Sequence, residues 1–383
     1  MKKLFYFAAA AVALAACAKN EVIPVNSGEN QEITFNVAPK TKAEDDHHHT
    51  EFGKDKVFAS WAYYLGPNKT WKDNSADAVE YISGATISYN TTENVWKAGK
   101  SYYWPKDGGS LTFFAYSLYK ENLDFKTVNV EGDDIKRSTV VCHSNTGIFA
   151  HIDLSVDKNV DFLVADPAMD KKSNVDKDKH FVDGVPTLFR HKLSYIIFNV
   201  KTDKNYSDAG KTLTLKSIKF NNVSYEGEYR DIASTSPAIS AGFTSANGEG
   251  AVVNYTGGST ESPFSQEIKS TNSGISSIDN YLYIPQTFTK GSKTDKNAYI
   301  EVKYTIATKV GKDEHDQDIV VTEDVTKQIF LNPEDGKGTK MFDEWEMGKK
   351  YTINLTFTLD EILWDPAVKD WEDVTPAAGY DVK

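Results

Sequence analysis

Cysteine, methionine and basic charge are all scarce in this chain of 383 residues. It contains 2 Cys and 4 Met, and its 43 Lys and Arg are outnumbered by 55 Asp and Glu, which gives a net charge of −12. Because such a surface repels phosphate backbones, we expect no nucleic-acid binding. The remaining composition, 40% hydrophobic and 26% charged, is typical of globular proteins and excludes wholesale disorder.

Catalytic motifs are also missing, since no Gly-x-Ser-x-Gly, Walker, Gly-x-Gly-x-x-Gly, His-Glu-x-x-His or Cys-x-x-Cys pattern occurs. The triplet His47–His49 follows two aspartates, but consecutive side chains on a hydrophilic loop do not all converge on a metal, so a solvated loop is preferred. His151 and Asp153 share one face of an expected strand, which suits a metal or a catalytic pair, although an exposed strand face is favoured. We therefore expect no enzyme, no cofactor and no metal site.

Aromatic residues, by contrast, are abundant. The chain has 20 Phe, 20 Tyr and 7 Trp, a balance that favours strands over helices. No stretch keeps a helical period, so any helices should be short. At about 150 residues per domain, the length predicts two domains, or three small ones.

The amino terminus has the pattern of an export signal. Lys2 and Lys3 precede the apolar stretch Leu4–Leu14, which is too short to span a bilayer, and Leu14-Ala15-Ala16-Cys17 resembles a bacterial lipoprotein box. We predict a signal peptide at residues 1–16, acylation of Cys17, and a polar tether over residues 17–31. The lipid would attach the exported protein to a membrane.

Cys142 then remains as the single unmodified cysteine, so an internal disulfide is excluded and the fold must depend on its apolar core. It lies in a β-branched run, Ser138–Cys142, that reads as a strand. A buried, inert thiol is therefore favoured over a reactive one.

The first strand of the fold is expected at Glu32–Val37. Its alternation places Ile33, Phe35 and Val37 on one face. Pro39 ends the pairing, and the hydrophilic residues 40–49 predict a loop that a protease can reach.

Further strands follow at short spacing, separated by Gly, Asn, Asp and Pro, and this pattern predicts an antiparallel sandwich. A Lys- and Asp-rich stretch, Asp170–Lys179, interrupts them and suggests a division near Val185, with one sandwich at residues 32–185 and another at 186–383. The strands expected in the first part are Val57–Leu65, Ala85–Tyr89, Lys100–Trp104, Leu111–Tyr116, Ser138–His143 and Val160–Ala165.

The second part has cleaner alternation, at Ile300–Ile306 and at Tyr351–Leu359. Between Leu215 and Ile218 the apolar parity changes, which predicts a bulge or a turn. From Asp231 to Asn280 the chain is rich in Ser, Thr, Gly and Asn, and we expect long loops with room for one hairpin.

Aromatic and apolar motifs recur in order through both halves of the chain. They are Cys17, Ile33–Phe35 with the basic loop after it, Val95-Trp96, Tyr103–Pro105, Leu111–Tyr116, Phe189–Val200, Tyr281–Gln286, Trp345–Tyr351 and Trp371. Together these motifs resemble the fimbrillin family, the Mfa-like and FimA-like pilins and pilus-associated lipoproteins of Bacteroidales. The resemblance covers nearly the whole chain after the signal peptide.

The resemblance implies an all-β fold of two transthyretin-like sandwiches and a role in building an adhesive pilus. In such pilins a protease cuts after a basic residue, the first strand leaves with the lipid, and another subunit fills the gap by strand addition. Lys42 matches the cut site best, with Lys40 as the alternative. The family usually has arginine there, and no arginine precedes Arg137 here, so an arginine-specific protease would leave the subunit lipidated like an anchor.

The sequence does not decide which segment of a subunit acts as the donor strand. If Trp371 closes the last core strand, residues 372–383 form a tail of about 40 Å when extended, with apolar Val374, Tyr380 and Val382. Pro376–Gly379 within it suits a hinge or a frayed end equally well. Stalk, tip and anchor roles are all compatible with these features. The expected partners are sister subunits, a maturation protease, the outer membrane and a host or bacterial surface ligand.

A second function class is a surface lipoprotein that binds glycans. Flat aromatic rings stack on sugar faces, and four of them occur within a short stretch, although sandwich strands bury such residues routinely. The four candidate platforms are Trp96, Tyr102, Tyr103 and Trp104.

Overall fold

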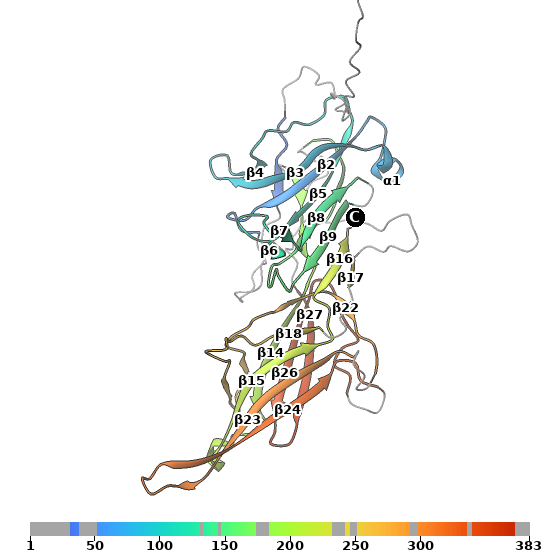
Figure 1. The fold of residues 1–383 in the computed structure, drawn as a ribbon. Helices are drawn as coiled ribbons and strands as arrows, with labels where there is room; N and C mark the ends of the chain where they lie inside the picture. Colours follow the sequence, from blue (N-terminus) through green and yellow to red (C-terminus); the bar gives the residue numbers. More distant parts are fainter. Residues whose placement is uncertain are drawn as a thin grey trace, which may run out of the picture.

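The computed structural model describes residues 31–37, 52–130, 133–144, 147–173, 184–231, 242–245, 251–291, 297–334 and 339–371. These residues form an elongated molecule built almost entirely of strands, with two β bodies arranged end to end (Figure 1). The helical segments among them are short: α1 (Trp71–Asn74) and 3₁₀ turns at Ser75–Asp77 and Ser207–Ala209. None of these helices is long and apolar enough to cross a membrane. The expected all-β class is confirmed.

A large mixed sheet lies in the upper body of Figure 1. Its strand β5 is buried along its whole length because both of its faces are covered: Phe113 packs into one core, and Phe114 and Tyr116 pack into another. The described strands, in order across the sheet, are β12 (Val185–Thr187), β1 (Phe35–Val37), β4 (Val95–Ala98), β3 (Val79–Asn90), β2 (Phe58–Leu65), β5 (Ser110–Ser117), β10 (Leu163–Ala165) and β13 (Phe189–His191), with β11 (Ala168–Lys171) also beside β5.

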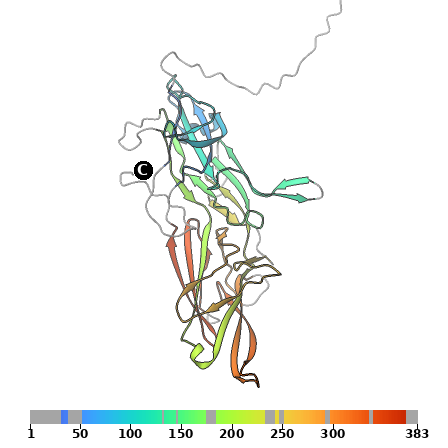
Figure 2. The same cartoon turned by 90° about the vertical axis from the view of Figure 1, so that its left-hand side faces the viewer.

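The opposing sheet of this body combines strands from both sides of residue 185. Its described order is β17 (Gly242–Ser245), β16 (Glu226–Arg230), β9 (Gly147–Asp153) and β8 (Thr139–His143). Because β16 pairs with β9, strands that follow the proposed division near residue 185 are hydrogen-bonded to strands that precede it. A separate hairpin, β6 (Thr127–Val130) and β7 (Asp133–Lys136), projects from the body (Figure 2).

The lower body is a sandwich of two sheets around one core of Leu, Ile, Val and aromatic side chains. Its described strands in one sheet are β20 (Ser273–Gly274), β14 (Ser194–Thr202), β26 (Lys349–Phe357) and β27 (Ile362–Asp370), with β21 (Leu282–Tyr283) beside β14. Those in the other sheet are β18 (Val252–Asn254), β15 (Lys211–Asn221), β23 (Tyr299–Lys312) and β24 (Asp318–Phe330), with β19 (Gln266–Ile268) beside β15. A short pair, β22 (Gln286–Thr287) and β25 (Glu344–Trp345), completes it.

Period-two alternation located two inner strands of the lower body correctly. The face predicted at Ile300–Ile306 lies in β23, and the face predicted at Tyr351–Leu359 lies in β26 as far as Phe357. The parity change after Leu215 is a bulge at Leu215/Ser217. The expected strand Lys100–Trp104 is wrong, because Tyr103 makes only an isolated bridge to Glu32. The span Val160–Ala165 is a strand only from Leu163, and short strands β17 to β20 lie in the stretch expected as loops.

Candidate functional site: the position of β1

β1 is an inner strand of its sheet. It pairs in parallel with β12, in the register Phe35↔Val185, and antiparallel with β4 through Phe35↔Trp96. The residues before it extend the pairing: the Ile33 amide donates to the Tyr102 carbonyl at 2.7 Å, and the Val185 amide donates to the Thr34 carbonyl at 2.8 Å. β1 is therefore held by backbone bonds along both edges.

The side chains of this segment fill the core beneath the sheet. Ile33 and Phe35 are each 3% exposed, whereas Val37 is half-buried, so the predicted shared face is buried most deeply at its first two positions. The Phe35 ring meets Phe58 and Phe113 edge to face, with centroids 5.5 and 5.9 Å apart. Full burial of such side chains stabilises a fold by roughly 1.5–3 kcal/mol each.

Gly184 allows β12 to approach β1 closely. Its φ of +142° lies in a region that L side chains rarely adopt, and a Cβ there would lie 2.7 Å from the Phe35 carbonyl carbon. Only glycine fits this position without a shift of one strand. The residue was not singled out in the sequence, where a lone glycine before Val185-Pro186 reads simply as a turn.

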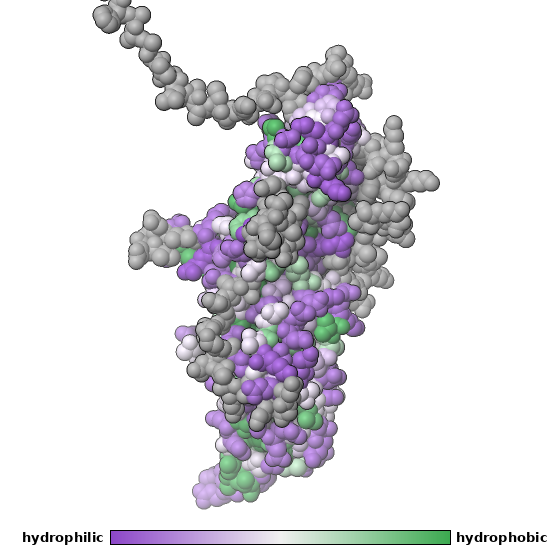
Figure 3. Space-filling view, turned by 90° about the vertical axis from the view of Figure 1, so that its right-hand side faces the viewer, coloured by the Kyte–Doolittle hydropathy of each residue, from purple (hydrophilic) through white to green (hydrophobic). Residues whose placement is uncertain are grey.

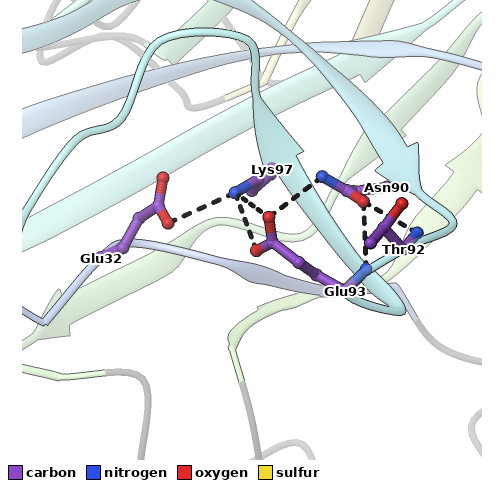
Figure 4. Close-up of polar contacts among 5 residues, drawn as sticks. All are labelled: Glu32, Asn90, Thr92, Glu93 and Lys97. Carbon is purple, nitrogen blue, oxygen red and sulfur yellow. Dashed lines mark hydrogen bonds and ion pairs between the residues drawn. The ribbon is translucent and has the colours of Figure 1, made fainter.

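An ion-pair chain ties the start of the segment to the β3–β4 hairpin (Figure 4). The Lys97 ammonium lies 2.8 Å from Glu93 and 3.5 Å from Glu32. The hydrogen bond to Glu93, more than the charge of Glu32, raises the pKa of Lys97. Because these ion pairs lie near solvent, they contribute little to stability compared with the buried rings.

Removal of β1 would expose both of its neighbours. Within the described ranges β12 has no strand partner other than β1, and β4 would keep only β3. The vacated position would present two rows of unpaired backbone groups above an apolar floor that includes Phe58 and Phe113. An extended segment with apolar residues at alternate positions would fit that slot, which we call the β1 slot.

Several predicted site residues lie outside the described residues. They are the lipidation residue Cys17, the cut-site candidates Lys40 and Lys42, and the tail residues Val374, Tyr380 and Val382.

Trp371, the last described residue, defines where the tail begins. It is buried, stacks on His191 with ring centroids 3.8 Å apart, and donates its amide to the Gly348 carbonyl at 2.7 Å. It packs in a core that includes Phe114 of the upper body and Tyr195 of β14, at the junction of the two bodies. The last described residue is therefore buried and fixed beside that junction.

Among the described residues, the other chemical groups considered in the sequence do not come together as a catalytic or metal site. Asp153 is buried rather than on an exposed face, which corrects that expectation: its carboxylate accepts the Ser155 amide at 2.9 Å in a local turn. The described residues contain no group of three or more His, Cys, Asp or Glu that could hold a metal. Cys142 is half-buried, and burial raises the pKa of its thiol to about 12, which disfavours the reactive thiolate.

The aromatic side chains considered for glycan stacking are mostly internal. Trp96 and Trp104 are buried in the core under β1, Tyr102 is half-buried, and Tyr103 alone of the four is exposed, at 39%. The expectation of a four-ring platform is therefore wrong, because two of the rings pack inside the core.

Comparison with known proteins identifies the family. A model of fimbrillin-like proteins matches residues 22–371. The chain belongs to the fimbrillin-like family. The family is one of fimbrial, cell-surface proteins and is not an enzyme family. No curated protein matches the chain.

A solved structure shares this fold. A fimbrial protein from Bacteroides vulgatus ATCC 8482 shares 16% identity and a TM-score of 0.59, over 90% of this chain and 100% of that one. Weaker likenesses include the fimbrilin FimA of Porphyromonas gingivalis W83, at 10% identity and a TM-score of 0.40 over 86% and 90% of the chains. Another is the tip fimbrial protein Mfa3 of P. gingivalis with a C-terminal truncation, at 8% and 0.35 over 90% and 100%.

Proposed function

We propose that this fimbrillin-like protein is a pilus subunit or pilus-associated lipoprotein that joins other subunits by strand exchange at the β1 slot. The observation that carries the proposal is the inner position of β1 between β12 and β4. A strand at the edge of a sheet could leave without opening a cleft, whereas an inner strand leaves two unpaired edges facing each other.

The proposed sequence of events begins at the membrane. Acylated Cys17 anchors the precursor to the outer membrane, and a protease cuts after Lys42, or after Lys40. The released segment takes Ile33, Phe35 and Val37 out of the sheet. An extended segment of a sister subunit then pairs with β12 and β4 and inserts its own apolar side chains. Because donor and acceptor surfaces differ, the contact is head to tail and extends into a filament.

The tail after Trp371 is the proposed donor. Its root is fixed at the junction of the two bodies by the buried indole, and an extended tail of 12 residues reaches about 40 Å. Val374, Tyr380 and Val382 would replace the buried side chains of β1. The subunit would present a host or bacterial surface ligand site at the cell surface, which makes adhesion the proposed outcome.

Limited proteolysis tests the exchange. The full chain is treated with a low dose of trypsin, with and without a large excess of a synthetic peptide of residues 31–37. We expect cleavage near Lys42 to convert single subunits into a ladder of oligomers, and the peptide to suppress the ladder because it competes for the β1 slot. The matched control is the same peptide with Phe35→Asp, which trypsin does not cut and which cannot bury its charge in the slot, so it should not suppress the ladder.

Two results would contradict the proposal. One is a chain that is cut after Lys42, loses residues 31–37, and stays a single subunit at every concentration. The other is a ladder that forms equally well when both Lys40 and Lys42 are replaced by Ala, because cleavage in that loop would then be irrelevant to assembly.

A further inference from the structure

The β23–β24 hairpin extends beyond its own sandwich. β15 pairs with β23 from Asn221↔Tyr299 to Lys211↔Thr308, and past that point β23 has β24 as its only described partner. β23 and β24 stay paired out to Lys312↔Asp318, with a bulge between Lys309 and Gly311. The hairpin projects from the end of the lower body that lies away from the upper body (Figure 1).

This projection carries apolar side chains in solvent. Val310, Ile319, Val320 and Val321 are 58%, 44%, 47% and 56% exposed, and they are four of the most exposed large hydrophobic residues in the described part of the chain. Hydrophobic surface is visible at the same end of the molecule in Figure 3. A soluble surface rarely gathers such residues unless something covers them.

β24 is also a long strand with one unpaired edge. It runs over 13 residues and pairs only with β23 within the described ranges. Along this edge, backbone amide and carbonyl groups of alternate residues point away from the sheet, which makes it a template for another strand. Glu323 is exposed and makes no ion pair with any described residue.

We propose that β24 is a self-pairing edge, which joins two copies of this chain in an antiparallel, two-fold dimer centred on Val325. The charge pattern of the strand argues for a second copy as the occupant. In this register Glu323 of each copy lies opposite Lys327 of the other, twice by symmetry, and apolar residues face apolar residues. The apolar pairs within β24 are Val325 with Val325, Val321 with Ile329 and Val320 with Phe330.

Neighbouring registers of the same strand are disfavoured. In an antiparallel dimer, residues opposite each other have side chains on the same face of the sheet, so the two-fold axis must pass through a residue. The neighbouring registers place this axis at Asp324 or Glu323 in one direction along the strand and at Thr326 in the other. The first two place like charges directly opposite each other, which is destabilising. A centre at Thr326 sets Val325 against Lys327 and Glu323 against Ile329, so it pairs charges with apolar residues.

The proposed register also covers the projecting tip. Each tip, with Ile319, Val320 and Val321, would lie beside the base of β24 in the other copy, where Ile329 is buried at the edge of the sandwich. The Lys327 ammonium already donates to the Asp360 carbonyl at 2.7 Å and has further protons for a carboxylate. Each copy would therefore supply the apolar surface that the other copy's hairpin lacks.

Cysteine cross-linking in cell envelopes tests the register on the uncut protein, with β1 in place, so its result is separate from that of the proteolysis experiment. Val325→Cys should give a disulfide-linked dimer, because the two copies of residue 325 lie opposite each other. Thr322→Cys is the matched control: two copies of residue 322 would be about 20 Å apart and should not cross-link. The parent chain, with its native Cys17 and Cys142, should stay uncross-linked.

A mixture of Asp324→Cys and Thr326→Cys chains tests the same register without altering the core-facing side of β24. We expect a mixed dimer and no dimer from either variant alone. Cross-linking of Thr322→Cys to itself, or no cross-link from either Val325→Cys or the mixture, would overturn the proposal.

Charge exchange supplies a second readout. Sedimentation in density-matched detergent measures the mass of the full chain in solution. At micromolar protein concentration, this mass should be that of a dimer. Glu323→Lys places two Lys pairs in contact and should weaken the dimer about tenfold. The double variant Glu323→Lys/Lys327→Glu restores opposite charges and should recover the parent affinity. A monomeric parent, or a double variant no tighter than Glu323→Lys, would refute self-pairing at this edge.

Discussion

At the scale of single residues, burial separates the side chains that hold β1 from those that merely lie near it. Phe35 contacts two buried rings, whereas Val37 is half-buried and the Glu32–Lys97 pair lies near solvent. Since apolar area removed from water stabilises a fold in proportion to its extent, Phe35 should dominate the retention of the strand.

Phe35→Ala should lower the free energy of unfolding of the uncut protein by about 3–4 kcal/mol, because it leaves a cavity under the sheet. Val37→Ala is the matched control and should cost about 1 kcal/mol. Chemical denaturation followed by tryptophan fluorescence measures both. Equal effects of the two substitutions would mean that the β1 core contacts do not matter as described.

Asp231 gives the protein a pH dependence. Burial raises the pKa of its carboxyl to about 6, the Lys192 charge opposes the shift, and the Oδ2 atom has no hydrogen-bond partner among the described residues. The unfolded value is about 4, so the folded state binds more protons between these values. Stability is therefore greatest below about pH 4 for this group and falls as the pH rises through 6.

Asp231→Asn should remove the loss of stability that accompanies ionisation of this carboxyl as the pH rises. Because the side chain is only half-buried by surface area, we expect a gain of about 1–2 kcal/mol at pH 7 and little change at pH 4. Thermal unfolding at a series of pH values measures it. A variant with the same pH profile as the parent between pH 4 and 7 would show that Asp231 does not titrate as proposed.

At the scale of secondary-structure elements, the β1–β12 contact depends on a backbone conformation. Gly184→Ala should loosen the pair, since both the positive φ and the 2.7 Å approach to Phe35 disfavour a side chain. Hydrogen exchange of the Val185 amide, which donates to Thr34, should accelerate at least tenfold. Gly99→Ala is the control, because a Cβ there meets no atom within 4 Å. Unchanged exchange at Val185 would contradict the argument.

Period-two patterning predicted elements well where one face is buried and failed where other forces decide. β26 and β23 were readable because their inward residues are apolar and their outward residues polar. β24 was not anticipated, because most of it is exposed on both faces and its pattern carries no alternation. Its pairing comes from the neighbouring strand rather than from its own composition.

At the scale of the whole molecule, the proposed release of β1 depends on which protease cuts after Lys42 or Lys40. The cut-site candidates are lysines, and no arginine precedes Arg137. Lys42→Arg should therefore make the chain a substrate for an arginine-specific protease and shift it from a lipidated precursor to a shorter form that assembles. Immunoblots of cell envelopes and of sheared pili measure both forms. Lys56→Arg is the control, since residue 56 follows the loop, close to β2, and cutting there should not reproduce the same mature end.

The sequence by itself determined the class of this protein. Its aromatic and β-branched alternation specified an all-β fold, the order of its motifs specified the fimbrillin-like family, and the alternation in Glu32–Val37 identified the strand that fills the β1 slot. These features are local, so each can be read from neighbouring residues.

Only the tertiary structure decided that β1 is an inner strand. Its partners Val185 and Trp96 are about 150 and 60 residues away in the chain, and parallel pairing across such distances leaves no local pattern. The burial of Trp96 and Trp104, which rules out the aromatic platform, could not be predicted from the sequence either. A tryptophan in the sequence looks the same whether its ring faces solvent or the core. Long-range packing selects among the local possibilities, and that selection places β1 between two partners, so that its proposed removal would open a slot.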